Sequence, residues 1–120
     1  MIKFGILAAL VMPGLAQAMT VNEFLAKAAA LQAKGMAAMI SPDLGLVRDE
    51  IKTAAEAYRA DLDSAKAAGR KPRGCPPPKG QARIDSKSLI ASFETIPPAK
   101  RTMSVKAAFY SLMDRKYPCP

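Results

Sequence analysis

The chain has 120 residues, of which 18 are Lys or Arg, 10 are Asp or Glu and none is His, giving a formal net charge of +8. Without histidine, Ser-His-Asp and Cys-His catalysis and imidazole metal sites are excluded. The length allows one domain with a single modest core, and because tryptophan is absent, that core must consist mainly of Leu, Ile, Val, Met and Ala.

Residues 1–18 contain the three parts of a secretory signal. Lys3 supplies the positive charge, an apolar run extends to Met12, and Ala16-Gln17-Ala18 offers small residues at a peptidase site. The apolar run is far shorter than the roughly 20 residues that a membrane span needs. We therefore expect a cleaved signal peptide, no stable membrane insertion, and a single mature domain over residues 19–120. Its expected location is the periplasm, with secretion as the fallback.

Two long helices are predicted in the first half of this domain. Thr20 and Glu23 fit a capping box in which Glu23 reaches back to the Thr20 N–H, and helical spacing of apolar residues predicts a helix over residues 21–39. Ser-Pro-Asp at residues 41–43 is a second start signal, and Gly69 is a suitable C-cap for a helix over residues 42–68. The apolar stripe of this second helix consists of Leu44, Val47, Ile51, Ala54, Tyr58, Leu62 and Ala65. The short link implies an antiparallel hairpin over residues 19–69.

Residues 70–85 form a basic connector with three consecutive prolines at 76–78. Such a run is extended and has no N–H donors, as in a stiff linker or a proline-rich ligand, and we favour the linker.

Two shorter helices are predicted within residues 86–120. Ser86 is a suitable N-cap for the first, which Pro97-Pro98 ends, and the last begins either at Pro98 or at a Ser104 cap. The expected apolar faces are Leu89, Ile90 and Phe93 in the first, and Val105, Ala108, Phe109, Leu112 and Met113 in the last. No window alternates like a strand, so the predicted fold class is all-α, a small bundle of about four helices.

The two cysteines, Cys75 and Cys119, lie 44 positions apart and lack the CxxC spacing of a redox motif. Export favours oxidation, so the even count predicts one disulfide between them, with intermolecular pairing and free thiols as alternatives. Four carboxylates that acid/base catalysis would need alternate with Lys and Arg on a predicted helix, where pairing in solvent is expected instead. These are Asp49, Glu50, Asp61 and Asp63. We expect no enzyme activity, no cofactor and no metal.

Charge is unevenly distributed along the mature domain. Residues 19–68 hold six Lys or Arg against seven Asp or Glu, whereas residues 69–120 hold eleven against three. A basic surface steers acidic partners, anionic lipid or cell-wall polymer; nucleic acid is not an expected partner of an exported protein. A solvated surface without a partner is the alternative. Residues 100–116 are cationic and partly amphipathic, and we expect their apolar side to face the core rather than a membrane.

Three proline motifs resemble a known family. They are Cys75-Pro76-Pro77, Ile96-Pro97-Pro98 and Tyr117-Pro118-Cys119. Over residues 75–119 the chain resembles the Rap/Tai-type immunity proteins, which protect bacteria from peptidoglycan amidases delivered by type VI secretion. The resemblance implies an all-helical periplasmic protein, often a homodimer, with a Cys75–Cys119 disulfide, that plugs the active-site cleft of an amidase. It assigns no partner-binding residue. The alternative hypothesis is a structural envelope protein whose basic half contacts peptidoglycan or anionic lipid.

Overall fold

The computed structural model describes residues 18–82 and 84–120, so the predicted signal peptide lies, except for Ala18, outside the described residues. The described residues form four α-helices and two 3-10 turns: α1 Val21–Lys34, η1 Gly35–Ile40, α2 Pro42–Ala67, α3 Ser86–Glu94, η2 Pro98–Lys100 and α4 Val105–Lys116. They contain no strand, only one isolated bridge. The predicted all-α class is confirmed.

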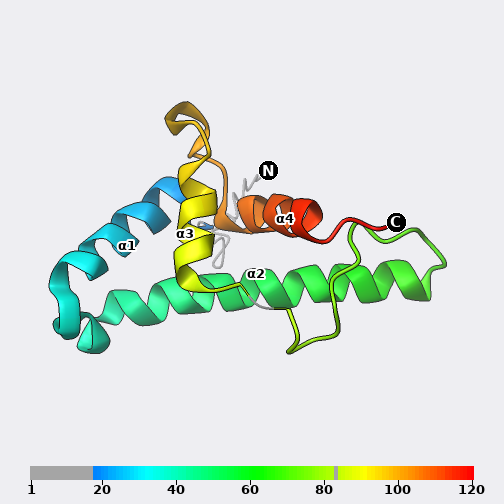
Figure 1. Cartoon of the computed structure of the whole chain (residues 1–120), viewed down its shortest axis with the longest axis horizontal. Coiled ribbons are helices and arrows are strands. Elements are labelled where there is room, and N and C mark those ends of the chain that lie inside the picture. The colour runs from blue at the N-terminus through cyan, green and yellow to red at the C-terminus, as the bar shows by residue number, and fades with distance from the viewer. Residues whose placement is uncertain (1–17, 83) are drawn as a thin grey trace, which may run out of the picture.

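The long helix α2 runs along the longest axis of the molecule, and the other helices lie on one side of it (Figure 1). Its 26 residues span about 39 Å at the usual rise per residue. Helix α4 lies along its C-terminal part and makes the most extensive helix–helix contact, while α1 diverges from its N-terminal part. Helix α3 packs on α1. One end of α2 is therefore covered by α4, and the other end is covered only in part.

The helix boundaries follow the predicted capping signals at three positions. The Thr20 and Ser41 hydroxyls accept the N–H groups of Glu23 and Asp43 at 3.1 and 3.3 Å. The Ser104 hydroxyl caps α4, which selects this start over Pro98. Glu23 differs from the prediction, because its carboxylate accepts a hydrogen bond from the Thr20 hydroxyl rather than from the Thr20 N–H.

Three other boundaries differ from the prediction. Helix α1 ends at Lys34 instead of continuing to residue 39, because Gly35 takes φ +56° and the next residues form the tighter 3-10 turn. Asp85, not Ser86, caps α3. Gly69 follows the C-cap Ala68 and, with φ +68°, supports a Schellman motif in which the N–H of residue 70 donates to the carbonyl of residue 65.

The core lies where the start of α1, the middle of α2, α3 and α4 meet. Phe24 and Phe93 contact edge to face at 5.3 Å between centroids, and Tyr58 contacts Phe109 and Tyr110 in the same manner. The starts of α1 and α4 are also joined by backbone bonds between residues 21 and 103 and between residues 105 and 19. Among the described helices, none combines the length and apolar character that a bilayer crossing requires.

Candidate functional site

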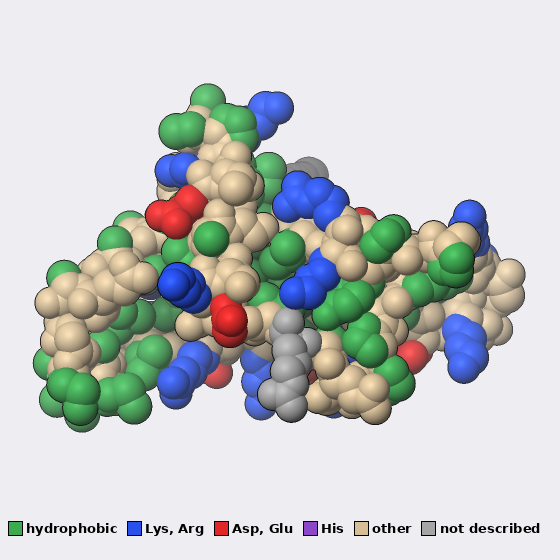
Figure 2. Space-filling model, viewed as in Figure 1, with side chains coloured by type: hydrophobic (Ala, Val, Ile, Leu, Met, Phe, Trp, Pro, Cys, Tyr) green, Lys and Arg blue, Asp and Glu red, His purple; other side chains and the backbone are tan. Residues whose placement is uncertain are grey.

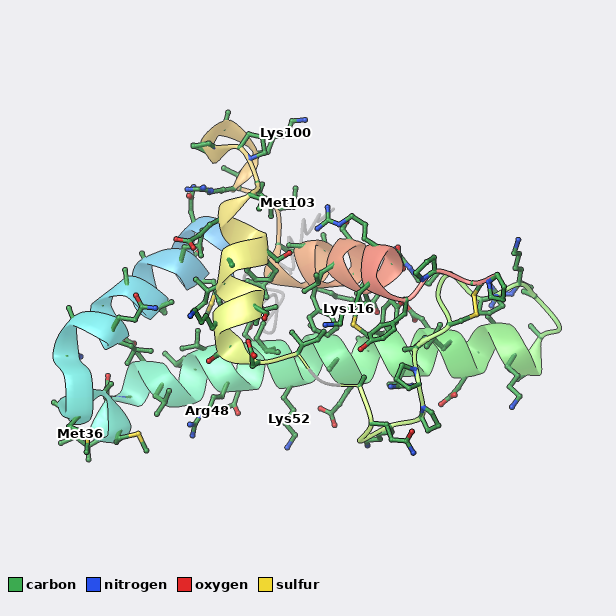
Figure 3. All side chains as sticks on the ribbon, in the orientation of Figure 1. Met36, Arg48, Lys52, Lys100, Met103 and Lys116 are labelled. Carbon is green, nitrogen blue, oxygen red and sulfur yellow. A yellow bond between two sulfur atoms is a disulfide. The ribbon has the colours of Figure 1, made fainter. Side chains whose placement is uncertain are left out.

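The end of the α1–α2 hairpin exposes a group of large apolar side chains, which we call the hairpin tip. Met36 and Ile40 are each 88% exposed, Met39 is 66% exposed and Leu46 is 51% exposed. Figure 2 shows hydrophobic side chains gathered at this end of the molecule, and Figure 3 places Met36 at its outer edge. Single exposed apolar residues are ordinary, but a contiguous group marks a contact surface.

The local backbone explains why the hairpin tip is exposed. Gly35 has φ +56°, which turns the chain out of α1, and η1 then projects beyond the ends of both long helices. Within the described residues η1 contacts α1 and α2, and none of its side chains is buried. The tip is therefore a short convex element held by two rigid helices.

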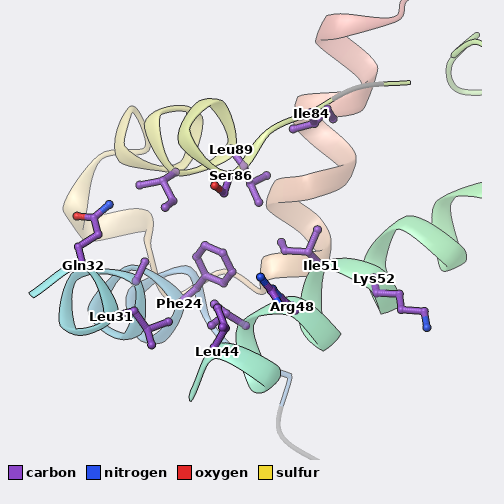
Figure 4. Close-up of a pocket in the computed structure, with 13 residues that line it drawn as sticks. Phe24, Leu31, Gln32, Leu44, Arg48, Ile51, Lys52, Ile84, Ser86 and Leu89 are labelled. Carbon is purple, nitrogen blue, oxygen red and sulfur yellow. The ribbon is translucent and has the colours of Figure 1, made fainter. Parts of the chain in front are cut away.

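An apolar groove of about 510 Å3 lies beside the hairpin tip, between α1, the first half of α2 and α3 (Figure 4). It exists because α4 covers only the other half of α2 and because α3 packs on α1 rather than on α2. Its apolar walls are Phe24, Ala28, Leu31, Leu44, Val47, Ile51, Ile84, Leu89 and Ile90.

The groove has few polar residues, and the charged ones are all positive. Arg48 and Lys52 of α2 line it together with Gln32 and Ser86, and no Asp or Glu lines it among the described residues. Arg48 and Lys52 are one helical turn apart and exposed, and Figure 3 shows both extending from α2. A second pocket, of about 530 Å3, continues along α2 and shares Ile51, Lys52 and Ile84 with the groove.

A polar network secures the opposite end of the domain. The Tyr58 hydroxyl donates to the Asp114 carboxylate at 3.0 Å, and Arg73 of the connector pairs with the same carboxylate at 2.8 Å. The Arg73 guanidinium also lies 4.6 Å from the centroid of the Tyr110 ring, whose hydroxyl donates to Asp61 at 2.8 Å. These contacts bind α2, the connector and α4 to one another.

This environment shifts the pKa values of its members. Burial raises the pKa of Tyr58 to about 12, and its hydrogen bond to Asp114 acts in the same direction. Burial likewise raises the pKa of Tyr110 to about 12, with Asp61 adding to the effect. The hydrogen bond from Arg73 lowers the pKa of Asp114. Near neutral pH both tyrosine hydroxyls are therefore protonated and can donate, and Asp114 is ionised and can accept. These protonation states stabilise the network.

The predicted pair of cysteines comes together beside this network. Cys75 and Cys119 form a disulfide with a Cα–Cα distance of 4.9 Å, and the Cys75 N–H donates to the Tyr117 carbonyl at 2.8 Å. Gly74 is buried against Tyr58, and a Cβ there would overlap the Tyr58 hydroxyl. The disulfide therefore fixes the connector against the end of α4, far along α2 from the hairpin tip.

The four predicted carboxylates do not form a common site. Asp49 and Asp63 are exposed and Glu50 is half-buried, whereas Asp61 accepts the hydrogen bond from Tyr110. For Asp61 the expected pairing with solvent-exposed cations is therefore wrong, because a tertiary partner from α4 reaches it. No group of three or more acidic, Cys or His side chains in the described residues is placed to hold a metal ion.

Sequence reasoning missed Tyr110, Arg73 and Asp114. The only signal for them was weak: Asp114 is one of three acidic residues in the basic stretch 69–120. Sequence reasoning also missed the exposed tip, because Met36, Met39 and Ile40 resemble a continued helix face when the break at Gly35 is ignored. No family model, curated protein or solved structure matches the chain.

Proposed function

We propose that the protein is an exported binding module that acts in the periplasm as an immunity-type inhibitor, blocking a peptidoglycan amidase by occluding its active-site cleft. The target class comes from the resemblance carried by the Cys-Pro-Pro motif at Cys75 and the Tyr-Pro-Cys motif at Cys119. The observation that carries the mode of action is the hairpin tip, where four large apolar side chains are exposed on a convex, helix-supported end. No catalytic activity is part of the proposal.

Occlusion of a cleft needs a protruding element that remains ordered before binding, since ordering it on binding would cost affinity. The tip meets this need, because α1 and α2 hold both ends of η1. Burying an apolar side chain of this size contributes about 1.5–3 kcal/mol, so Met36, Met39 and Ile40 have the character of binding hot spots.

The test uses an amidase encoded beside the gene, expressed in the periplasm of a sensitive host. We expect the wild-type chain to restore growth and to inhibit peptidoglycan cleavage in vitro. The double variant Met36→Asp/Ile40→Asp should lose both effects, while Ala91→Asp/Ala99→Asp, which adds the same charge at two exposed positions on α3 and η2, should keep them. Failure of the wild-type chain to inhibit any such amidase would refute the proposal.

The alternative, contact of the basic half with peptidoglycan or anionic lipid, has its own supporting observation. Exposed cations are distributed over the connector, η2 and the solvent-facing side of α4. They are Arg70, Lys71, Lys79, Lys100, Lys106 and Arg115. Salt-sensitive sedimentation with purified sacculi or anionic vesicles would support this function, and no sedimentation at low salt would exclude it.

A further inference from the structure

The groove has the size and lining of a small-molecule site. Its volume of about 510 Å3 lies within the range of about 300–1,000 Å3 in which such sites fall. Side chains from α1, α2 and α3 and from Ile84 give it apolar walls on several sides, as Figure 4 shows. Apolar walls open to water are unfavourable, so an apolar occupant would be stabilised there.

The positive charge at the edge of the groove favours an occupant whose polar end is anionic. Arg48 and Lys52 form no ion pair or hydrogen bond with the described part of the chain, and like charges one turn apart repel each other slightly. In Figure 4 Arg48 lies between Leu44 and Ile51, while the Lys52 amine points outward. The lysine stem is flexible enough to bring its ammonium back towards a headgroup.

The described acidic residues near Arg48 and Lys52 do not line the groove. Asp49 and Glu56, their neighbours along α2, are exposed, and Glu56 lines the second pocket instead. Asp43 is paired with Lys27 at 3.4 Å, and the Asp85 carboxylate accepts the Ser88 N–H at 2.7 Å as the cap of α3. Ser86, in the first turn of α3, lines the groove, so the positive end of that helix faces the same region. Because Asp85 already caps this helix end, the groups offered to an anionic headgroup are the two cations, Arg48 and Lys52.

The dimensions favour a narrow occupant over a helix. An α-helix with its side chains is about 10 Å wide, so two turns of it fill about 850 Å3, more than the groove holds. A single hydrocarbon chain fits the groove and can extend into the second pocket, since Ile51, Lys52 and Ile84 line both. Lys52 stands at this junction.

We propose that the groove binds a single-chain amphiphile with an anionic headgroup. The hydrocarbon chain lies on the apolar walls contributed by α1, α2 and α3, and the headgroup binds Arg48 and Lys52. A fatty acid and a lysophospholipid share this chemistry. The site is separate from the hairpin tip, so its occupancy does not depend on inhibition of an amidase.

The test is calorimetric titration of the full mature chain with four twelve-carbon probes below their micelle concentrations. These are laurate, dodecyl phosphate, dodecyl maltoside and dodecyltrimethylammonium. We expect the two anions to bind at one site and the neutral and cationic probes to bind about tenfold more weakly or not at all. Comparison of laurate with dodecyl phosphate distinguishes a carboxylate from a phosphate headgroup. Equal binding of the neutral probe would overturn the proposal.

Charge variants locate the headgroup. Arg48→Ala/Lys52→Ala should weaken laurate binding about tenfold, and Arg48→Glu/Lys52→Glu should shift the preference to dodecyltrimethylammonium. Lys66→Ala/Arg70→Ala is the matched control, since it removes the same charge at the far end of α2 and should bind laurate as the wild type does. All four side chains replaced in these variants are exposed, so the fold should be retained. Equal weakening by the control pair would refute headgroup binding at Arg48 and Lys52.

Methyl NMR locates the chain. Laurate should shift the signals of Leu31, Leu44 and Ile90, which line the groove, and leave those of Met36 and Met39 at the tip unchanged. Shifts confined to the tip would overturn the proposal. So would groove signals that shift with protein concentration alone, because a second copy of the chain would then cover the groove.

Discussion

Removal of the Cys75–Cys119 disulfide is expected to lower the free energy of unfolding by about 4 kcal/mol. The two cysteines are separated by 44 positions, and opening a loop of that length returns conformational entropy to the unfolded chain. Domains of this size are typically stable by only about 5–15 kcal/mol, so the loss is a large part of the total. The variant is Cys75→Ala/Cys119→Ala, which leaves no unpaired thiol.

The native structure should survive this change because other contacts hold the same junction. The backbone bond from Cys75 to Tyr117 remains, as does the Arg73–Asp114 ion pair at 2.8 Å. Arg59 of α2 also donates to the carbonyl of Pro77 at 2.7 Å, which fixes the connector further along. The main effect is therefore expected in the unfolded state.

Urea unfolding followed by circular dichroism measures this effect. We expect a lower midpoint and a larger m-value in the variant, because the open chain exposes more surface when it unfolds. Reduction of the wild-type protein should reproduce both changes. A loss below about 1 kcal/mol with an unchanged m-value would refute the reasoning, since the cross-link would then not restrict the unfolded chain.

Three further predictions follow from individual residues. Replacing Asp114 by Asn should destabilise the domain at pH 7 and less so in acid. The pKa of Asp114 is lowered on folding, so its contribution is fully present above the usual carboxyl pKa and is lost as pH falls through the lowered pKa of the folded state. Urea unfolding of both proteins over a series of pH values from 7 downwards checks this. Tyrosine absorbance should show Tyr58 and Tyr110 ionising near pH 12, and Tyr58→Phe and Tyr110→Phe should each remove part of that step; ionisation of both residues near pH 10 would contradict their burial. Gly35→Ala should lower stability by about 1 kcal/mol, since φ there is +56°. Gly45→Ala should raise stability by up to about 1 kcal/mol, because Gly45 lies in the helical backbone of α2 with open space around it. Thermal unfolding measures both changes.

Local signals in the sequence predicted most of the helices. Start signals at Thr20, Ser41 and Ser104 act through hydrogen bonds within three residues, and they are confirmed. The apolar stripe of α2 is also confirmed, with Val47, Ala54, Tyr58 and Ala65 buried. The error at Gly35 arose because this residue takes a positive φ that ends α1. The error at the start of α3 arose because Asp85 and Ser86 are both suitable caps and Asp85 takes the role.

The candidate site was not predictable in the same way. The groove and the hairpin tip exist because the N-terminal part of α2 is left partly uncovered. Helix α4 lies on the C-terminal part of α2, and α3 packs on α1. No residue pattern marks Arg48 and Lys52 as different from the other cations of α2, because their role depends on the apolar walls that α1 and α3 place beside them.

The sequence by itself determined the helical class and the pairing of Cys75 with Cys119, because periodicity, caps and a cysteine count of two leave few alternatives. Only the tertiary structure decided which apolar side chains remain in solvent, and that Tyr58, Arg73 and Asp114 meet. The physical reason is the separation along the chain of the residues that interact. Hydrogen bonds within a turn are encoded by neighbours, whereas burial and cross-helix contacts depend on how all four helices share the same space.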